Sequence, residues 1–189
     1  MRAGAPVEEV AAGRVVSAGR TIAARSVVVA AGCWSGAFHG APPVRPVKGQ
    51  ILRLRGGPLA ERLVRTPRCY VVSRPDGEVV VGATVEERGF DTSVTAGGVH
   101  RLLEAAWEVL PEVEELELVE TAARLRPGSP DNAPSIGERD GVVWATGHHR
   151  NGVLLAPVTA QAVAEIVMGR EPPDTVLPFA PARFEAVAR

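Results

Sequence analysis

The sequence predicts an α+β protein with a mostly antiparallel sheet, joined by helices, and with the remnant of a parallel sheet. Two apolar runs, Cys69–Ser73 and Glu78–Ala83, flank Arg74-Pro75-Asp76-Gly77. Proline and glycine in such a turn favour an antiparallel hairpin. Residues 27–32 are instead a continuous apolar, β-branched run, typical of a strand covered on both faces in a parallel sheet.

Short strands are expected on either side of that run. Gly13 and Gly19 separate three apolar segments near the N-terminus, which predicts a small meander of strands at Val7–Val10, Val15–Val16 and Thr21–Ala23. Residues 51–54 predict another strand, and Val142–Ala145 predicts a buried strand late in the chain.

Two helices are expected. Apolar residues recur at helical spacing from Val99 to Leu110, with Thr95 as the N-cap and Pro111 just past the end. The second helix is predicted over Val158–Met168, with Pro157 in its first turn, where a missing N–H costs little, and Gly169 as its stop.

An acidic strip from Glu112 to Glu120 lies between the helices and is expected to be a solvated helix end and strand edge. A strand predicted over residues 116–122 leads to the motif Arg124-Leu125-Arg126-Pro127, which is expected to follow it. The proline-containing tail from Pro172 onward is expected to pack loosely.

Composition narrows the class of protein. The chain has 189 residues, 46% hydrophobic and 23% charged, with a net charge of −1, so no global field favours nucleic acid or an anionic membrane. Cys33 and Cys69 form no CxxC pair, and no apolar run is long enough to span a membrane. The N-terminus has no apolar signal core, so we expect a cytoplasmic protein without nucleic-acid or membrane partners.

Several catalytic motifs are missing. The sequence contains no GxSxG, HExxH or P-loop motif, and no GxGxxG. His148 and His149 are adjacent, and neighbouring side chains on extended backbone point opposite ways, so no metal site is predicted there. A Rossmann-type strand at 27–32 without a phosphate fingerprint indicates an incomplete dinucleotide domain.

Two arginines and one tyrosine are the candidate binding residues. Arg126 precedes a proline, which restricts the backbone, and a guanidinium suits bidentate binding of a carboxylate. Arg150 lies in a glycine-bounded turn before the last helix, where unpaired N–H groups attract electron-rich ligands. Tyr70, the single tyrosine, lies on an apolar strand. Each residue also has a structural alternative: Arg126 could form a salt bridge to a nearby glutamate, Arg150 could be an exposed or helix-capping loop arginine, and Tyr70 could be an aromatic at the edge of the core.

Five segments together resemble the flavin-dependent D-amino acid oxidase superfamily, with the glycine oxidases of thiamine biosynthesis as the nearest members. These segments are VVVAAGCWSG, PVKGQIL, CYVVSRPDGEVVVGAT, LRPGSPDNAPSIG and GHHRNGVLLAP, and they follow the family's order through nearly the whole chain. The resemblance implies a mostly antiparallel substrate-binding sheet with helices, plus the C-terminal remnant of a Rossmann-like FAD-binding domain.

The resemblance also implies roles for single residues. Arg126 is similar to the arginine that binds the substrate carboxylate, Tyr70 to the tyrosine that supports it, and Arg150 would lie near both substrate and flavin. Val7 matches a backbone contact on the adenine side, and Lys48-Gly49-Gln50 resembles a loop near the flavin ring. The remaining implied cofactor contacts are Gly32, His148, Arg150, Asn151, Gly152, Val153 and Leu154.

The implied domains are residues 1–45, a remnant of the FAD-binding domain; 46–124, the substrate-binding domain; 125–170, a return to the FAD-binding domain; and 171–189, a tail. The opening strand–GxGxxG–helix unit of the family is absent. We therefore expect either a truncated piece or a second polypeptide that supplies the N-terminal FAD-binding half, and weak or absent FAD binding by this chain alone. An apolar surface at Val27–Val29 should then be exposed.

The implied reaction is oxidative deamination of glycine or a small amino acid with O2, giving an imine or keto acid, ammonia and H2O2. Arg68 and Val85 stand where the family can carry histidine and methionine, so the exact amine is left open. Sarcosine, proline or a larger D-amino acid are the alternative substrates, and an inactive fragment that serves as an interaction domain is the alternative of another class. A homo-oligomer is also left open.

Overall fold

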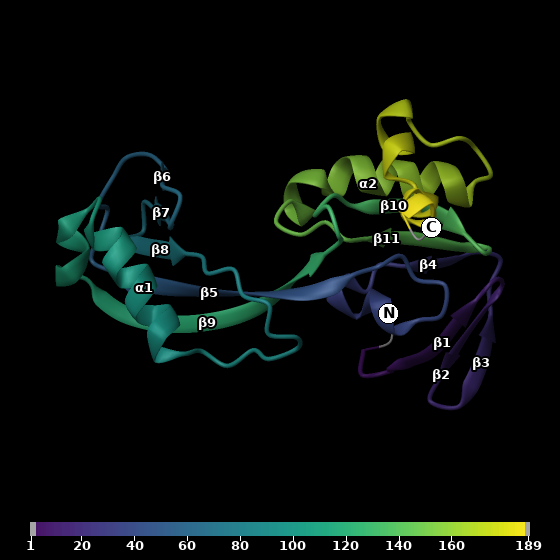
Figure 1. The fold of residues 1–189 in the computed structure, drawn as a ribbon, viewed down its shortest axis with the longest axis horizontal. Helices are drawn as coiled ribbons and strands as arrows, with labels where there is room; N and C mark the ends of the chain where they lie inside the picture. Colours follow the sequence, from purple (N-terminus) through teal and green to yellow (C-terminus); the bar gives the residue numbers. More distant parts are fainter. Residues whose placement is uncertain (1–2, 188–189) are drawn as a thin grey trace. The chain divides into compact units, whose positions relative to one another are not determined.

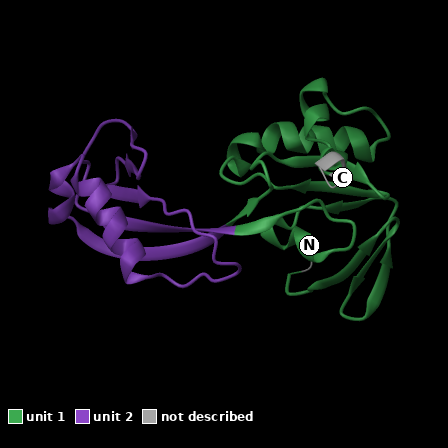
Figure 2. Cartoon of the chain, viewed as in Figure 1, with its two compact units in different colours: residues 1–46, 126–189 green, residues 47–125 purple. Residues whose placement is uncertain are grey.

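The computed structural model describes residues 3–187, with side chains described to residue 184. Contacts divide the chain into two compact units (Figure 2). Unit 1 contains residues 1–46 and 126–189, and unit 2 contains residues 47–125. The predicted α+β class is confirmed: two α-helices accompany three sheets in the described part of the chain, and most strand pairs are antiparallel.

Unit 1 begins with the predicted meander. Its strands are β1 (Val7–Ala11), β2 (Arg14–Ser17) and β3 (Arg20–Ala23), paired antiparallel in that order. Ala18 and Gly19 both take positive φ, 51° and 68°, in the tight turn between β2 and β3. Glycine tolerates this left-handed geometry readily, which explains why Gly19 marked the turn in the sequence.

The second sheet of unit 1 has the order β10 (Ser135–Arg139), β11 (Val142–Thr146), β4 (Val27–Val29). The predicted strand at Val142 is confirmed, and β4 pairs with β11 in parallel. The expectation for residues 27–32 is wrong in two respects: the strand stops at Val29, and Val28 is 42% exposed. Among the described strands, β4 pairs with β11 alone, so it lies at the edge of this sheet and is covered on one face.

Helix α2 (Gly152–Val167) lies against β10 and β11 (Figure 1). It begins well before the predicted Val158, so Pro157 falls in its second turn, and the first-turn placement is wrong. Gly169 follows the helix with φ +72°, the left-handed conformation that ends helices.

Two buried clusters and three short 3-10 helices complete the described part of unit 1. One cluster contains Val10, Val27, Val29, Val142 and Trp144. The other combines Ile136 and Ala162 with Val176, which is 3% exposed. The tail therefore packs more closely than expected, through the 3-10 helices η3 (Asp174–Phe179) and η4 (Pro181–Val187). A further 3-10 helix, η1 (Gly32–Ala37), follows β4.

Unit 2 contains most of a five-stranded sheet. The strand order is β6 (Val64–Arg65), β7 (Tyr70–Ser73), β8 (Glu78–Gly82), β5 (Arg45–Arg55) and β9 (Glu117–Gly128). The predicted β7–β8 hairpin is confirmed. The strand expected at 116–122 is longer than predicted, so Arg126 lies within β9 rather than after it.

Helix α1 (Ala96–Trp107) covers one face of this sheet (Figure 1). The predicted N-cap is confirmed, because Thr95 Oγ1 accepts a hydrogen bond from the Gly98 N–H at 3.1 Å. Leu102, Ala105 and Ala106 of α1 pack on the buried faces of β5, β7 and β8. A 3-10 helix, η2 (Pro111–Glu115), links α1 to β9.

Gly98 lets α1 approach the sheet closely. A Cβ at residue 98 would lie 2.3 Å from Gln50 Nε2, so the helix backbone rests directly on a side-chain amide. Within residues 3–187, Cys33 and Cys69 are buried free thiols, and the helices found there are not long and apolar enough to cross a membrane.

Candidate functional site

The glycine-bounded turn between β11 and α2 is hydrogen-bonded to the end of β9. The His149 N–H donates to the Pro127 carbonyl at 2.8 Å, and Gly128 and His148 form an antiparallel bridge. Gly147 and His149 both take left-handed conformations, with φ of +75° and +47°. This geometry is unusual for a non-glycine residue and is often found where a chain is shaped to hold a ligand.

The same bond brings the backbones of the two predicted arginines together. Arg126 directly precedes Pro127, and Arg150 directly follows His149, so one hydrogen bond links the two neighbourhoods. The Arg126 side chain is half-buried and that of Arg150 is exposed. Both belong to unit 1.

Helix α2 starts immediately after this turn without a side-chain cap. Asn151 occupies the N-cap position but makes no capping hydrogen bond, and the first helical bond runs from the Leu155 N–H to the Asn151 carbonyl. The N–H groups of Gly152, Val153 and Leu154 therefore precede the first intrahelical bond. Val153 is 94% exposed and Leu154 is 78% exposed, which is unusual for large apolar side chains.

Two other predicted cofactor residues of unit 1 lie at different places. Thr146 Oγ1 donates to the Gly32 carbonyl at 3.0 Å, which ties Gly32 to the end of β11, next to the turn. Val7 lies on β1 in the meander, 42% exposed, and no described contact joins it to the turn.

His148 is fixed by a side-chain bond that the sequence did not reveal. Its Nε2 lies 3.0 Å from Thr159 Oγ1, in the second turn of α2, and Thr159 is 9% exposed. Burial lowers the pKa of the His148 imidazole below its ordinary value of 6.5. The imidazole is thus neutral at pH 7 and connects the turn to the helix.

Tyr70 lies in unit 2, where its ring rests on a glycine. Tyr70 pairs with Gly82 across β7 and β8, and a Cβ at residue 82 would lie 2.4 Å from the Tyr70 hydroxyl oxygen. Glycine at this position thus leaves the space that the Tyr70 ring occupies. Nothing in the sequence pattern around Gly82 indicated this requirement.

Lys48, Gly49 and Gln50 lie within strand β5, so the expected loop is wrong. The side chains of Lys48 and Gln50 are both 0% exposed and are engaged inside unit 2. Lys48 Nζ donates to Asp91 Oδ2 at 2.9 Å, and Gln50 Nε2 donates to Glu86 Oε1 at 2.7 Å. Neither partner could be predicted from the sequence, because each lies about forty residues away along the chain.

Comparison with known proteins identifies the family. A model of FAD-dependent oxidoreductases, the DAO family, matches residues 1–166. The chain belongs to the DAO family of FAD-dependent oxidoreductases. The resemblance to the flavin-dependent D-amino acid oxidase superfamily, inferred from the sequence, is therefore confirmed.

Individual DAO proteins show how much of the fold is present. A glycine oxidase of Pseudomonas aeruginosa is 39% identical over 164 residues, 82% of this chain and 45% of that protein. The hydrogen cyanide synthase subunit HcnC of the same species is 35% identical over 187 residues, 92% of this chain and 45% of its own length. The crystal structure of Geobacillus kaustophilus glycine oxidase superposes with a TM-score of 0.84 at 36% identity, covering 90% of this chain and 48% of that one. The chain thus spans about half the length of the relatives it matches.

The α2 start fits the cofactor of the DAO family. Unpaired N–H groups at a helix N-terminus carry about half a positive charge, which favours the electron-rich edge of a flavin ring. The exposed apolar side chains of Val153 and Leu154 are suited to contact a flat aromatic ligand. The start of α2 therefore offers both hydrogen-bond donors and an apolar surface to such a ligand. The Lys48 and Gln50 side chains, by contrast, already form hydrogen bonds to partners within unit 2.

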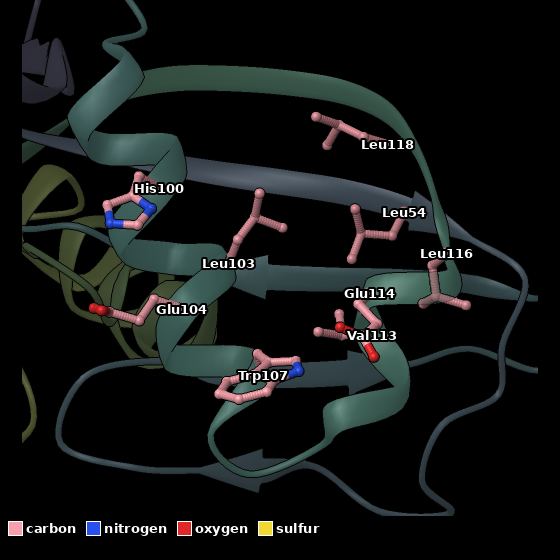
Figure 3. Close-up of a pocket in the computed structure, with 9 residues that line it drawn as sticks. All are labelled: Leu54, His100, Leu103, Glu104, Trp107, Val113, Glu114, Leu116 and Leu118. Atoms are coloured by element: carbon pink, nitrogen blue, oxygen red, sulfur yellow. The ribbon is translucent and has the colours of Figure 1, made fainter.

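A separate cavity of about 540 Å³ lies within unit 2, between α1, η2 and β9 (Figure 3). Leu54, Leu103 and Leu116 point toward a common space, and the sequence-predicted site residues are not among those that line it.

Arg68, which stands where the family can carry histidine, donates hydrogen bonds to Glu104 and Glu108 of the α1 region. Its charge is therefore paired on the surface of unit 2.

Replacing Gly82 with alanine should displace the Tyr70 ring. We expect a loss of about 1–3 kcal/mol in the free energy of unfolding, as for other overpacked sites. In protein labelled with fluorotyrosine, the single tyrosine gives one 19F resonance, which should shift. Gly97→Ala on α1 is the matched control, since its Cβ meets the flexible end of Arg101. An unchanged resonance in Gly82→Ala would contradict the packing described.

The lowered pKa of His148 makes stability depend on pH. In the unfolded chain His148 binds a proton more readily than in the folded protein. The free energy of unfolding should therefore be highest above the pKa of His148 in the unfolded chain, and should fall as the pH drops below about 6.5. His148→Gln keeps a hydrogen-bonding group near Thr159 and lacks this titration. Urea unfolding at a series of pH values should give a flatter profile for the variant. Identical profiles would show that His148 does not titrate as described.

Proposed function

We propose that this chain forms the substrate-binding part, with the flavin-ring contacts, of an FAD-dependent amino acid oxidase of the glycine-oxidase type. The observation that carries the proposal is the hydrogen-bonded junction in unit 1. There the end of β9 with Arg126, the Arg150 turn and the uncapped start of α2 meet. Family membership and the glycine oxidase relatives support the same conclusion.

The proposed reaction is oxidative deamination of glycine or a small amino acid. One molecule of amino acid, O2 and water gives a keto acid, ammonia and H2O2. Bound FAD would supply the two-electron oxidation by accepting a hydride from the substrate α-carbon. The chain's own residues then contribute orientation and charge complementarity.

Arg126 is proposed to bind the substrate carboxylate with its planar guanidinium, and Tyr70 to donate a hydrogen bond to that carboxylate. Arg150 and the N–H groups of Gly152, Val153 and Leu154 would stabilise negative charge on the ligand at the helix start. His148 is neutral and bonded to Thr159, so it orients this turn.

The remaining cofactor assignments also stay proposals. Val7 and Gly32 would contact FAD through the backbone, as would Asn151. Lys48, Gly49 and Gln50 are retained as backbone neighbours of the flavin, because the Lys48 and Gln50 side chains point to partners within unit 2. The domain ranges 1–45, 46–124, 125–170 and 171–189 remain predictions, as does the cytoplasmic location.

A larger amine is the second candidate substrate. Val85 stands where the family can carry methionine, and it is 57% exposed. A shorter side chain leaves more room for an N-substituted or larger amino acid, such as sarcosine, proline or a D-amino acid. In the chain joined to the N-terminal half of Geobacillus kaustophilus glycine oxidase, a panel of these substrates with peroxide detection distinguishes the candidates. Absence of peroxide with all of them, in a joined protein that retains flavin, would favour the interaction-domain alternative.

The chain on its own is expected to bind FAD weakly or not at all, because it lacks the GxGxxG unit that holds the ADP moiety. Gel filtration after incubation with FAD, followed by the absorbance spectrum, measures this directly. Stoichiometric flavin retained by the purified 189-residue chain would refute the expectation. The chain joined to the N-terminal half of Geobacillus kaustophilus glycine oxidase should retain flavin.

Arg126→Ala in that joined enzyme should remove a charge-assisted interaction. We expect a loss of about 2–3 kcal/mol of transition-state binding, or roughly 30- to 150-fold in kcat/KM for glycine. Arg124→Ala is the matched control, since Arg124 is an exposed arginine on the same strand, and should change kcat/KM by less than about twofold. Equal effects of the two substitutions would reject the role of Arg126.

A further inference from the structure

Residues 85–94, between β8 and α1, form a segment without helix or strand that is nevertheless held to the sheet. All side chains from residue 87 to 94 are exposed, including Phe90 at 55% and Val94 at 38%. A segment with few buried contacts keeps one conformation only through ties to neighbouring elements. The hydrogen bonds and ion pair that link residues 85–94 to neighbouring elements therefore determine the position of this segment.

The central tie is a buried ammonium group. Lys48 of β5 is 0% exposed, and its Nζ donates to Asp91 Oδ2 at 2.9 Å and lies 3.5 Å from Ser93 Oγ. A buried lysine is strongly disfavoured unless a counter-charge stays beside it. The Asp91 side chain is 45% exposed, and the hydrogen bond from Lys48 holds the pKa of its carboxyl well below the usual range. The ion pair thus draws the middle of the segment onto β5.

Gln50, two residues along β5, binds both ends of the segment. Its Nε2 donates to Glu86 Oε1 at 2.7 Å and to Thr95 Oγ1 at 3.1 Å, and its Oε1 accepts from the Thr95 N–H at 2.9 Å. Lys48 and Glu86 also exchange two backbone hydrogen bonds, at 2.9 and 3.0 Å. Two neighbouring side chains of one strand therefore fix the segment at three points.

The segment starts three residues after Gly82, the glycine that the Tyr70 ring touches. Tyr70 rests on Gly82, and Val85 follows three residues later with 57% of its surface exposed. Because Val85 is exposed and lies three residues along the chain from the glycine that the Tyr70 ring touches, its side chain is suited to contact a substituent on the substrate.

We propose that Lys48 is a positioning residue that holds residues 85–94, through Asp91, as the wall that selects the amine substrate. This inference rests on the proposed function. It gives the Lys48 side chain a different task from the flavin contact that family resemblance implies. The wall is apolar at Val85, so it selects for the size of an apolar substituent on the substrate rather than for charge.

The first test uses the 189-residue chain and needs no activity. Hydrogen exchange measured by mass spectrometry on peptides covering residues 87–95 should be at least tenfold faster in Lys48→Met and in Asp91→Asn. The double variant should exchange no faster than the faster single variant. Arg74→Gln, which breaks the exposed Arg74–Glu78 pair, is the control and should leave these peptides unchanged. Unchanged exchange in Asp91→Asn, which removes the counter-charge of Lys48, would show that this ion pair does not hold the segment.

The second test uses the enzyme in which this chain is joined to the N-terminal half of Geobacillus kaustophilus glycine oxidase. Both Lys48→Met and Asp91→Asn should change the ratio of KM for glycine to KM for sarcosine by at least fivefold, with FAD affinity altered less than twofold. Loss of FAD in Lys48→Met but not in Asp91→Asn would overturn the proposal in favour of a direct flavin contact. If the unsubstituted enzyme oxidises no amine, the proposed function is wrong, and the exchange experiment still decides whether the tether exists.

Discussion

The hydrogen bond from the His149 N–H to the Pro127 carbonyl is the contact on which the candidate site of unit 1 depends. It joins the end of a long strand to a turn whose left-handed residues could otherwise adopt other conformations. Once it forms, the chain direction after Gly147 is set, and α2 must start where its first N–H groups remain unpaired. This bond therefore brings the turn that carries Arg150, and the helix start that follows it, to the end of the strand that carries Arg126.

Unit 2 is organised by side chains rather than by a turn. Lys48 and Gln50 are fully buried polar residues, and each is satisfied by partners on the segment that leads to α1. Buried polar groups are costly when unpaired, so such a network specifies one arrangement of the segment. The apolar packing of Leu52, Val81 and Leu102 holds the sheet and α1 together, and the polar network fixes the segment that leads from β8 to α1.

Local patterns in the sequence predicted local structure well. The Pro75–Gly77 turn, the Thr95 cap and the Gly169 stop each depend on residues close in the chain, and all three are confirmed. The start of α2 differs from the prediction because Asn151-Gly152 resembles a loop, although the Asn151 carbonyl accepts the first helical hydrogen bond, from the Leu155 N–H. Side-chain pairs such as Lys48–Asp91 and His148–Thr159 leave no periodic pattern in the sequence, so only the structure reveals them.

The close approach of Gly98 to the Gln50 amide ties together two positions far apart in the chain. Any side chain at position 98 of the helix would collide with Gln50. Any shorter residue at position 50 of the strand would leave Thr95 and Glu86 without their shared hydrogen-bonding partner. Neither position is therefore free to drift alone during evolution. In homologous sequences the two should change in concert, with a bulkier helix residue accompanied by a smaller strand residue and by loss of the acidic partner at position 86.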